Sequence, residues 1–251
     1  MDLNGKTALV TGGSGDIGSA IANALALAGA DVAISYVGHK KGAAATADAV
    51  RAAGKRSLAV QLDQQDPVAI DAAVDTVVGE FGRVDILVNN AAWNIGIPFS
   101  DLAALTADIW DRVLDTNLRG PYLLARAFAP HLRAHKAGRI VNIASVGGLY
   151  PGSSSIAYSA SKAGLIHLTR CLAVALAPDV TVNCVAPGLV EGTRMAQRLP
   201  EEIVRMARSQ AVLERVASAR DIAAQVVTFC RADSITGQVL VIDGGVPGAM
   251  H

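Results

Sequence analysis

The hydrophobic pattern alternates between two kinds of segment along the whole chain. Short, nearly uninterrupted apolar runs rich in Val, Ile and Leu are typical of strands buried on both faces of a parallel sheet. Between them, apolar residues recur three and four positions apart, which indicates helices packed against that sheet. Seven strands are predicted, over residues 6–11, 31–37, 57–62, 84–89, 140–144, 180–186 and 236–242.

Predicted helices separate these strands and indicate the fold class. They follow the first glycine-rich turn up to Gly29 and then cover 41–53, 66–81, 106–134, a segment from Tyr158 to about 177, a short stretch after Pro200, and 218–232. Gly120 and Pro121 interrupt the long helix, so an irregular turn is expected near Asn117. Strands alternating with helices predict βαβ units and a parallel sheet covered on both faces. No repeat or linker interrupts the pattern, so residues 1–251 are expected to form a single α/β domain.

Composition narrows the possible partners and the compartment. The 251 residues include 22 basic and 22 acidic side chains, so net charge gives no reason to expect nucleic acid or an anionic membrane as partner. The uncharged run 140–161 is long enough to span a bilayer, but its six Ser, three Gly, Pro and Asn argue against a membrane helix. The N-terminus lacks the basic start of a secretory signal. Three scattered cysteines are expected to be buried free thiols in a reducing cytoplasm.

A glycine-rich turn joins the first predicted strand to the first helix. The turn reads Gly-Gly-Ser-Gly-Asp-Ile-Gly over residues 12–18. Glycines permit a tight turn and let backbone N–H groups approach a pyrophosphate at the start of the helix. An ordinary glycine-rich turn is the alternative, because the pattern is short.

The segment from Arg139 to Lys162 holds the candidate acid–base chemistry. Tyr158 and Lys162 are four positions apart, so on a helix they lie on one face. A cation beside a poorly solvated phenol stabilises the phenolate and is expected to lower the phenol pKa, so that a proton can move near neutral pH. Ser145, thirteen residues upstream at a strand end, could bond the same substrate oxygen. Such Tyr–Lys pairs also arise by chance on helix surfaces.

Six motifs in one order resemble the short-chain dehydrogenase/reductase family over nearly the whole chain. They are the turn at Thr11–Gly18, Asn89-Asn90-Ala91, Asn117 within Asp-Thr-Asn-Leu, Ser145, Tyr-Ser-Ala-Ser-Lys at 158–162, and Pro187-Gly188. The resemblance implies a seven-stranded, doubly wound sheet of the Rossmann type, in a homotetramer. It also implies a nicotinamide cofactor across the carboxyl ends of the strands.

The resemblance also implies roles for single residues. In the reductive direction Ser145 would polarise the carbonyl oxygen while Tyr158 protonates the developing alkoxide. Lys162 would lower the Tyr158 pKa and bind the nicotinamide ribose, and Asn117 would anchor a water linking Lys162 to solvent. Asp63 resembles the acid that contacts adenine. We assign cofactor binding to Gly12, Ser14, Gly15, Asp16, Ile17, Gly18, Tyr36, Lys40, Asp63, Gln64, Asn90, Ala91, Tyr158, Lys162, Pro187 and Gly188.

Two positions depart from the family pattern. The middle glycine of the phosphate turn falls at Asp16, which is expected to cap the helix through backbone N–H groups. Thr193 stands one residue further from Pro187-Gly188 than the usual spacing, which puts its role at the cofactor carboxamide in doubt.

Residues after the second strand indicate the cofactor. An acid at the end of that strand binds the adenine ribose in sites that take NAD, but this chain has Tyr36 there. Lys40 and Lys41 follow and offer cations to a 2′-phosphate. We therefore expect NADP(H) to be preferred, with NAD(H) possible, although the lysines could simply solvate the next helix.

The expected activity is hydride transfer between the cofactor and a ketone or secondary alcohol. Loops 93–100, 146–156 and 189–213 would form the substrate site, and their apolar character suggests a hydrophobic small molecule. The alternative is a 3-oxoacyl thioester carried on a carrier protein or CoA, with Arg126, Arg133, Lys136 and Arg139 as a local basic patch. A non-catalytic cofactor sensor, a dehydratase or an epimerase carries less weight. No metal site is expected.

Overall fold

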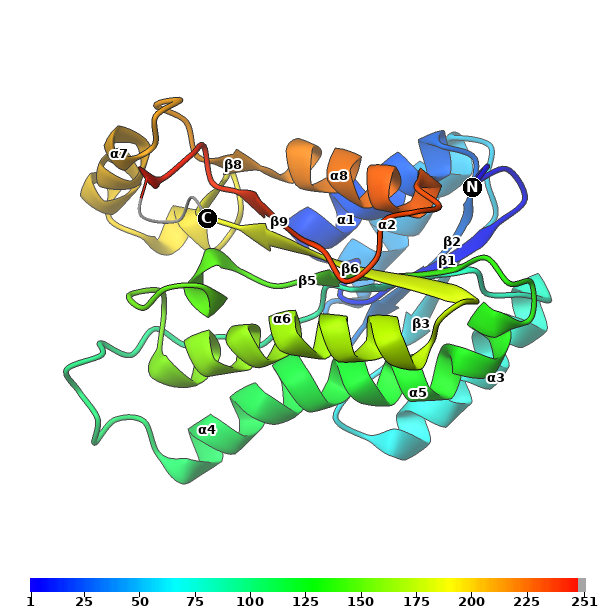
Figure 1. The fold of residues 1–251 in the computed structure, drawn as a ribbon, viewed down its shortest axis with the longest axis horizontal. Helices are drawn as coiled ribbons and strands as arrows, with labels where there is room; N and C mark the ends of the chain where they lie inside the picture. Colours follow the sequence, from blue (N-terminus) through cyan, green and yellow to red (C-terminus); the bar gives the residue numbers. More distant parts are fainter. Residues whose placement is uncertain (248–251) are drawn as a thin grey trace.

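A parallel sheet of seven strands forms the middle layer of the computed structural model, which describes residues 1–247 (Figure 1). Its order is β3-β2-β1-β4-β5-β6-β9, and every neighbouring pair is parallel. The doubly wound single-domain fold expected from the pattern is confirmed. The strands are β1 (Thr7–Val10), β2 (Asp31–Tyr36), β3 (Ser57–Gln61), β4 (Ile86–Asn89), β5 (Gly138–Ile143), β6 (Val180–Pro187) and β9 (Val239–Ile242).

Helices cover both faces of the sheet (Figure 1). One layer consists of α1 (Asp16–Leu27), α2 (Lys40–Ala52) and α8 (Ala219–Arg231), and the other of α3 (Pro67–Phe81), α4 (Ala107–Leu114), α5 (Gly120–Arg133) and α6 (Ile156–Ala175). Side chains of a strand point alternately to opposite faces. Accordingly Ala8 and Val10 of β1 enter the core under α1, while Leu9 between them enters the core under α5. Two apolar cores therefore cover the sheet, whose inner strands are buried, whereas the edge strands β3 and β9 are partly exposed.

The long helix expected over 106–134 is two α-helices joined by a single π-helical turn, Asp115–Arg119. Asn117 lies at the centre of that turn and is fully buried. A π-turn holds one more residue than an α-turn, which rotates the side chains that follow and is found frequently at functional sites. The irregularity expected near Asn117 is confirmed, and it directs this side chain into the protein.

The segment after β6 contains more structure than its sequence predicts. A short helix after Pro200 is present as α7 (Glu201–Gln210), preceded by a 3-10 turn, η3 (Ala196–Arg198). In addition β7 (Val190–Glu191) pairs in parallel with β8 (Ala217–Ser218) in a small second sheet. Two-residue strands are too short to show a hydrophobic period, which is why the sequence did not reveal them.

The three cysteines can be compared with the expectation that they are buried free thiols. All three thiols are free, and Cys184 and Cys230 are buried as expected. The expectation was wrong for Cys171, which is exposed because its position on α6 faces away from the sheet. Within residues 1–247, every helix is too short or too polar to cross a membrane.

A close backbone contact joins the end of β5 to the start of α6. After β5, residues Val146–Gly148 form a 3-10 turn, η2, that packs on α6. A Cβ atom on Gly148 would lie 2.6 Å from the carbonyl carbon of Lys162 and 2.7 Å from the amide nitrogen of Ala163. Only glycine permits this approach, which brings Ser145 next to the helix that carries Tyr158 and Lys162.

Gly148→Ala should therefore lower the free energy of unfolding by about 1–3 kcal/mol, because η2 and α6 must separate to admit the methyl group. Gly79→Ala is the matched control, because nothing lies within 4 Å of a Cβ at this position within α3. The control should be neutral or stabilising by up to about 1 kcal/mol, since alanine favours a helix interior. Urea unfolding measures both, and equal stability of the two variants would contradict the packing argument.

Candidate active site

The four predicted catalytic residues meet at the carboxyl edge of the sheet. Ser145 follows β5, Tyr158 and Lys162 lie one turn apart on α6, and Asn117 comes from the π-turn. All four are buried, with relative exposures between 0 and 8%. The Lys162 ammonium lies 5.7 Å from the centre of the Tyr158 ring. The serine, the phenol and the ammonium thus share one poorly solvated site.

Burial dominates the acidity of Tyr158. It raises the pKa of the phenol above its ordinary value, while a hydrogen bond with the Ser145 side chain lowers that pKa in part. Ser145 Oγ also accepts a hydrogen bond of 3.1 Å from the amide of Gly147, which holds the hydroxyl beside the phenol. At neutral pH the phenol is consequently protonated and can donate its proton.

The contacts of Lys162 differ from the expectation that it lowers the pKa of Tyr158. Its ammonium donates a 2.8 Å hydrogen bond to the carbonyl oxygen of Ile143, and burial lowers its pKa from 10.5 to about 8. We expected the cation to lower the pKa of Tyr158, but that pKa is raised. The physical reason is that desolvation is the largest influence on the phenol, while the ammonium directs its hydrogen bond to the end of β5.

Asn117 ties together three segments around the site. Its Oδ1 accepts from the amide of Trp93 at 2.8 Å, and its Nδ2 donates to the carbonyl of Trp93 at 2.9 Å and to Ser161 Oγ at 3.2 Å. The side chain therefore joins the loop after β4 to α6. Its amide is occupied by these partners, so any link from Asn117 to Lys162 does not run through direct contact of the two side chains.

The glycine-rich turn packs tightly against the segment after β4. Gly12 has a φ of 62°, and a Cβ atom there would lie 2.9 Å from the Cα of Ala91. A Cβ on Gly18 would lie 2.4 Å from the carbonyl oxygen of Gly12. Asn90 Nδ2 donates to the carbonyl of Thr11 at 2.8 Å, and Thr11 Oγ1 accepts from the amides of Asn90 and Ala91. Asn90 and Ala91 therefore shape this turn.

Asp16 does not cap α1, which corrects the expectation from its position. It is the first residue of the helix, and the N-cap Gly15 supplies no side chain. Its Oδ2 instead accepts a 2.8 Å hydrogen bond from the backbone amide of Arg194, and the guanidinium Nε lies 3.6 Å away. Asp16 therefore bonds a residue of the loop after β6 and not the N–H groups of its own helix. The first N–H groups of α1 thus have no side-chain cap, which is the chemistry that a dinucleotide pyrophosphate needs.

Two further cofactor candidates, Asp63 and Gln64, lie just beyond β3. Asp63 Oδ1 accepts from the amide of Gln65, so its carboxylate is held by a local turn. Gln64 is buried, and its amide donates to the carbonyls of Ala91 and Thr116 at 3.2 and 2.6 Å. The Gln64 side chain is thus a brace between the Asn-Ala segment and the π-turn.

The adenosine end of the predicted cofactor site lies between β2 and α2. Tyr36 ends β2 and is nearly buried, and Lys40 begins α2 and is exposed. Sequence reasoning missed His39, whose Nδ1 lies 3.1 Å from the carbonyl oxygen of Ser14 in the glycine-rich turn. The ring fills the space beside Gly42, where a Cβ would come within 2.4 Å of it. A histidine at a helix start gives no local signal of this contact.

The predicted substrate loops contact each other. Ile97 donates to the carbonyl of Ser154 at 3.2 Å, and Ser154 Oγ also bonds Asn94, so loops 93–100 and 146–156 are joined. Trp93 packs against the cluster that contains Tyr158. Met195 is half exposed on the third loop.

The end of β6 closes the site on the side of the third loop. Gly188 follows β6, and a Cβ there would lie 2.8 Å from Asp243, so the Pro187-Gly188 turn packs directly on the end of β9. Thr193 is buried, and its Oγ1 donates to the carbonyl of Val190 and accepts from the amide of Ala196, the first residue of η3. That hydroxyl serves its own loop, in keeping with its departure from the family spacing.

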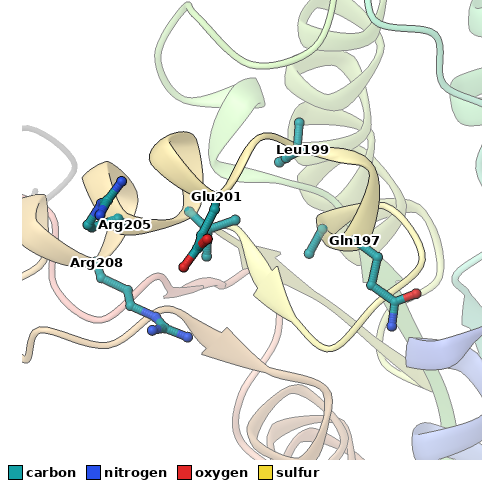
Figure 2. Close-up of a pocket in the computed structure, with 7 residues that line it drawn as sticks. Gln197, Leu199, Glu201, Arg205 and Arg208 are labelled. Atoms are coloured by element: carbon teal, nitrogen blue, oxygen red, sulfur yellow. The ribbon is translucent and has the colours of Figure 1, made fainter.

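Two hollows mark the surface outside the catalytic residues. One, of about 340 Å³, lies between η3 and α7, and Figure 2 shows Glu201, Arg205 and Arg208 along α7 with Gln197 and Leu199 from the segment before it. The other, of about 470 Å³, is largely apolar and lies between the π-turn, α5 and α6. Neither is lined by Ser145, Tyr158 or Asn117.

Comparison with known proteins identifies the family. The family profile described as short chain dehydrogenase matches residues 6–204. The 3-oxoacyl-[acyl-carrier-protein] reductase FabG of Staphylococcus aureus is 37% identical over 246 residues, covering 96% of this chain and 98% of that protein. The chain thus belongs to the short-chain dehydrogenase family of oxidoreductases.

Solved structures agree over the full fold. A short-chain dehydrogenase from Burkholderia cenocepacia in complex with NADP superposes with a TM-score of 0.89 and 40% identity, covering 98% of this chain and 99% of that one. A xylitol dehydrogenase bound to NAD⁺ superposes with a TM-score of 0.91 and 29% identity, covering 98% of this chain and all of that one. Similar structures thus include both an NADP and an NAD⁺ complex.

The lowered pKa of Lys162 should make stability depend on pH. The unfolded chain holds this proton more tightly than the folded one, so wild type is penalised below about pH 8 and recovers as pH rises toward 10.5. Relative to Lys162→Met, wild type should gain about 2 kcal/mol of unfolding free energy between pH 8 and pH 10. Urea unfolding at both pH values measures this, and a constant difference would show that Lys162 does not titrate in that window.

Proposed function

We propose that the protein is an oxidoreductase that prefers NADP(H) and transfers hydride between the nicotinamide and a ketone or secondary alcohol. The observation that carries the proposal is the buried Tyr158 phenol, which lies beside the Ser145 hydroxyl and one helical turn from the Lys162 ammonium. The bound nicotinamide supplies or accepts the hydride. The side chains position the substrate oxygen and move its proton.

Each residue has a physical role in reduction. Ser145 donates a hydrogen bond to the carbonyl oxygen and polarises it. Tyr158 gives its proton to the developing alkoxide, which suits a phenol that burial keeps protonated at neutral pH. Lys162, charged below about pH 8, stabilises the resulting phenolate and is assigned the nicotinamide ribose. Asn117 holds the loop after β4 against α6, which keeps the Tyr158 helix in register with the substrate loops.

A 3-oxoacyl thioester is the second candidate substrate, and the similarity to the FabG reductase favours it. The basic patch expected beside it needs correction. Arg126, Arg133 and Lys136 are exposed around α5, but Arg139 is buried and bonds the carbonyl of Cys230 and the carboxylate of Asp233. Arg139 belongs to β5, whose two faces are covered, so it cannot serve a carrier protein.

Alternatives without net hydride transfer fit less well. A cofactor sensor has no need of an acid–base group, yet this chain has Ser145, Tyr158 and Lys162 together. Nicotinamide absorbance, followed with both cofactors over a panel of ketones and 3-oxoacyl thioesters, tests the proposal and separates the two substrate classes. Turnover without net cofactor oxidation would indicate a dehydratase or epimerase instead.

Tyr158→Phe should reduce kcat by at least ~100-fold, because only the transferable proton is lost. The ring remains, so the fold and the cofactor affinity should stay close to those of wild type. Steady-state kinetics and a cofactor titration measure the two quantities separately. Near-normal kcat in this variant would show that another group protonates the substrate.

The cofactor preference rests on the residues between β2 and α2. Tyr36 stands where an acid would bind the adenine ribose and repel a 2′-phosphate. The first turn of α2 contains no acid, and Lys40 and Lys41 are exposed there. His39 adds a polar ring against the Ser14 carbonyl. These groups favour an additional phosphate at this end of the site.

Wild type should show a higher kcat/KM with NADPH than with NADH. The double variant Tyr36→Asp, Lys40→Ala should shift the ratio toward NADH by about one to two decades, since it adds a repulsive carboxylate and removes a charge-assisted bond. Lys55→Ala is a suitable control because it removes a partly exposed lysine outside the β2–α2 segment. Equal or better use of NADH by wild type would contradict the preference.

A further inference from the structure

A link between two distant segments lies directly over the predicted pyrophosphate site. Asp16, at the start of α1, accepts the backbone amide of Arg194, 178 residues further along the chain. The Arg194 guanidinium lies beside the glycine-rich turn. One terminal nitrogen is 3.6 Å from the position that a Cβ atom of Gly15 would occupy. Its Nε is 3.6 Å from the Asp16 carboxylate. The loop after β6 thus brings a cation to the glycine-rich turn.

Charge explains why the two residues occur together. Asp16 replaces the middle glycine of the turn, and an unpaired carboxylate there would repel a pyrophosphate. The Arg194 guanidinium neutralises it, and as a planar fork with five N–H donors it retains donors for a second anion. Both side chains are partly exposed, so an arriving phosphate can reach the guanidinium.

The rest of the loop is held independently of this link. Glu191 in β7 forms an ion pair with Arg208 in α7, and β7 pairs with β8. Thr193, immediately beside Arg194, accepts a hydrogen bond from the amide of Ala196 in η3. The loop therefore has its own supports, and Arg194 with Asp16 forms its contact with the phosphate turn.

We propose that Arg194 is a further cofactor-binding residue, whose guanidinium contacts the cofactor pyrophosphate, and that Asp16 positions it. The inference rests on the proposed function only in requiring a nicotinamide dinucleotide.

Calorimetric titration of the full chain with NADPH, without substrate, tests the contact. Arg194→Ala should raise the Kd roughly 10- to 100-fold, the range for one charge-assisted hydrogen bond at a phosphate. Arg194→Lys should keep part of the affinity, since the charge remains but the fork is lost. Arg198→Ala is the matched control, because it removes an exposed arginine of the same loop four residues further on. It should change the Kd by less than about twofold.

A second substitution separates a direct contact with the phosphates from neutralisation of Asp16. Asp16→Asn introduced into Arg194→Ala should lower the Kd again, by roughly 3- to 10-fold, because it removes a carboxylate that has lost its partner. Asp16 lies on α1 and stays beside the phosphate turn when Arg194 is removed, so Asp16→Asn recovers only the loss caused by the unpaired carboxylate. The loss that remains measures the direct contact between Arg194 and the phosphates. The melting temperature of each variant without cofactor identifies any general loss of fold.

The outcomes distinguish this inference from the proposed function. A Kd for Arg194→Ala within about twofold of the Arg198→Ala value overturns the contact while leaving the proposed function intact. A double variant Arg194→Ala, Asp16→Asn that regains the wild-type Kd also overturns it, since Arg194 then acts only by neutralising Asp16. Failure of wild type to bind either NADPH or NADH overturns the proposed function together with this inference.

Discussion

The buried ammonium of Lys162, bonded to the carbonyl oxygen of Ile143, is the contact on which the site depends. A charge excluded from water must find a partner, and here the partner lies at the carboxyl end of a central strand. The bond holds α6 against β5, where the missing side chain of Gly148 permits backbone contact. The burial that lowers the pKa of Lys162 to about 8 also raises the pKa of Tyr158. The site therefore combines a protonated phenol with a cation that is close to losing its proton.

The topology explains why the residues proposed to bind the cofactor lie beside the proposed catalytic ones. From β1 the chain runs outward through β2 to β3 and then returns to place β4 on the other side of β1. At such a switch point the connections leave in opposite directions and open a crevice at the carboxyl edge. The glycine-rich turn after β1 and the Asn90-Ala91 segment after β4 occupy that position and are bonded to each other through Thr11. The π-turn then brings Asn117 against the next segment of the same edge.

Departures from the family pattern are compensated within the structure by partners distant in sequence. Asp16 puts a carboxylate into the turn that we propose binds phosphates, and Arg194 of the loop after β6 pairs with it. Thr193, displaced by one residue, stabilises its own 3-10 turn through Val190 and Ala196. Thr193 and Arg194 are neighbours, so both departures are accommodated where the loop after β6 contacts the glycine-rich turn. This contact joins the proposed phosphate site to the proposed substrate site.

The sequence by itself determined the elements whose signals are local. Strand and helix periods, the breaks at Gly120 and Pro121, and the four-residue spacing of Tyr158 and Lys162 depend only on near neighbours, and the structure agrees with them. Only the tertiary structure decided that Asp16 bonds Arg194, that Arg139 is buried, and that desolvation governs the pKa of Tyr158. These properties depend on which segments exclude water from a side chain and which distant group lies within hydrogen-bond distance of it. The local sequence pattern shows neither how much water reaches a side chain nor that its partner lies 178 residues away.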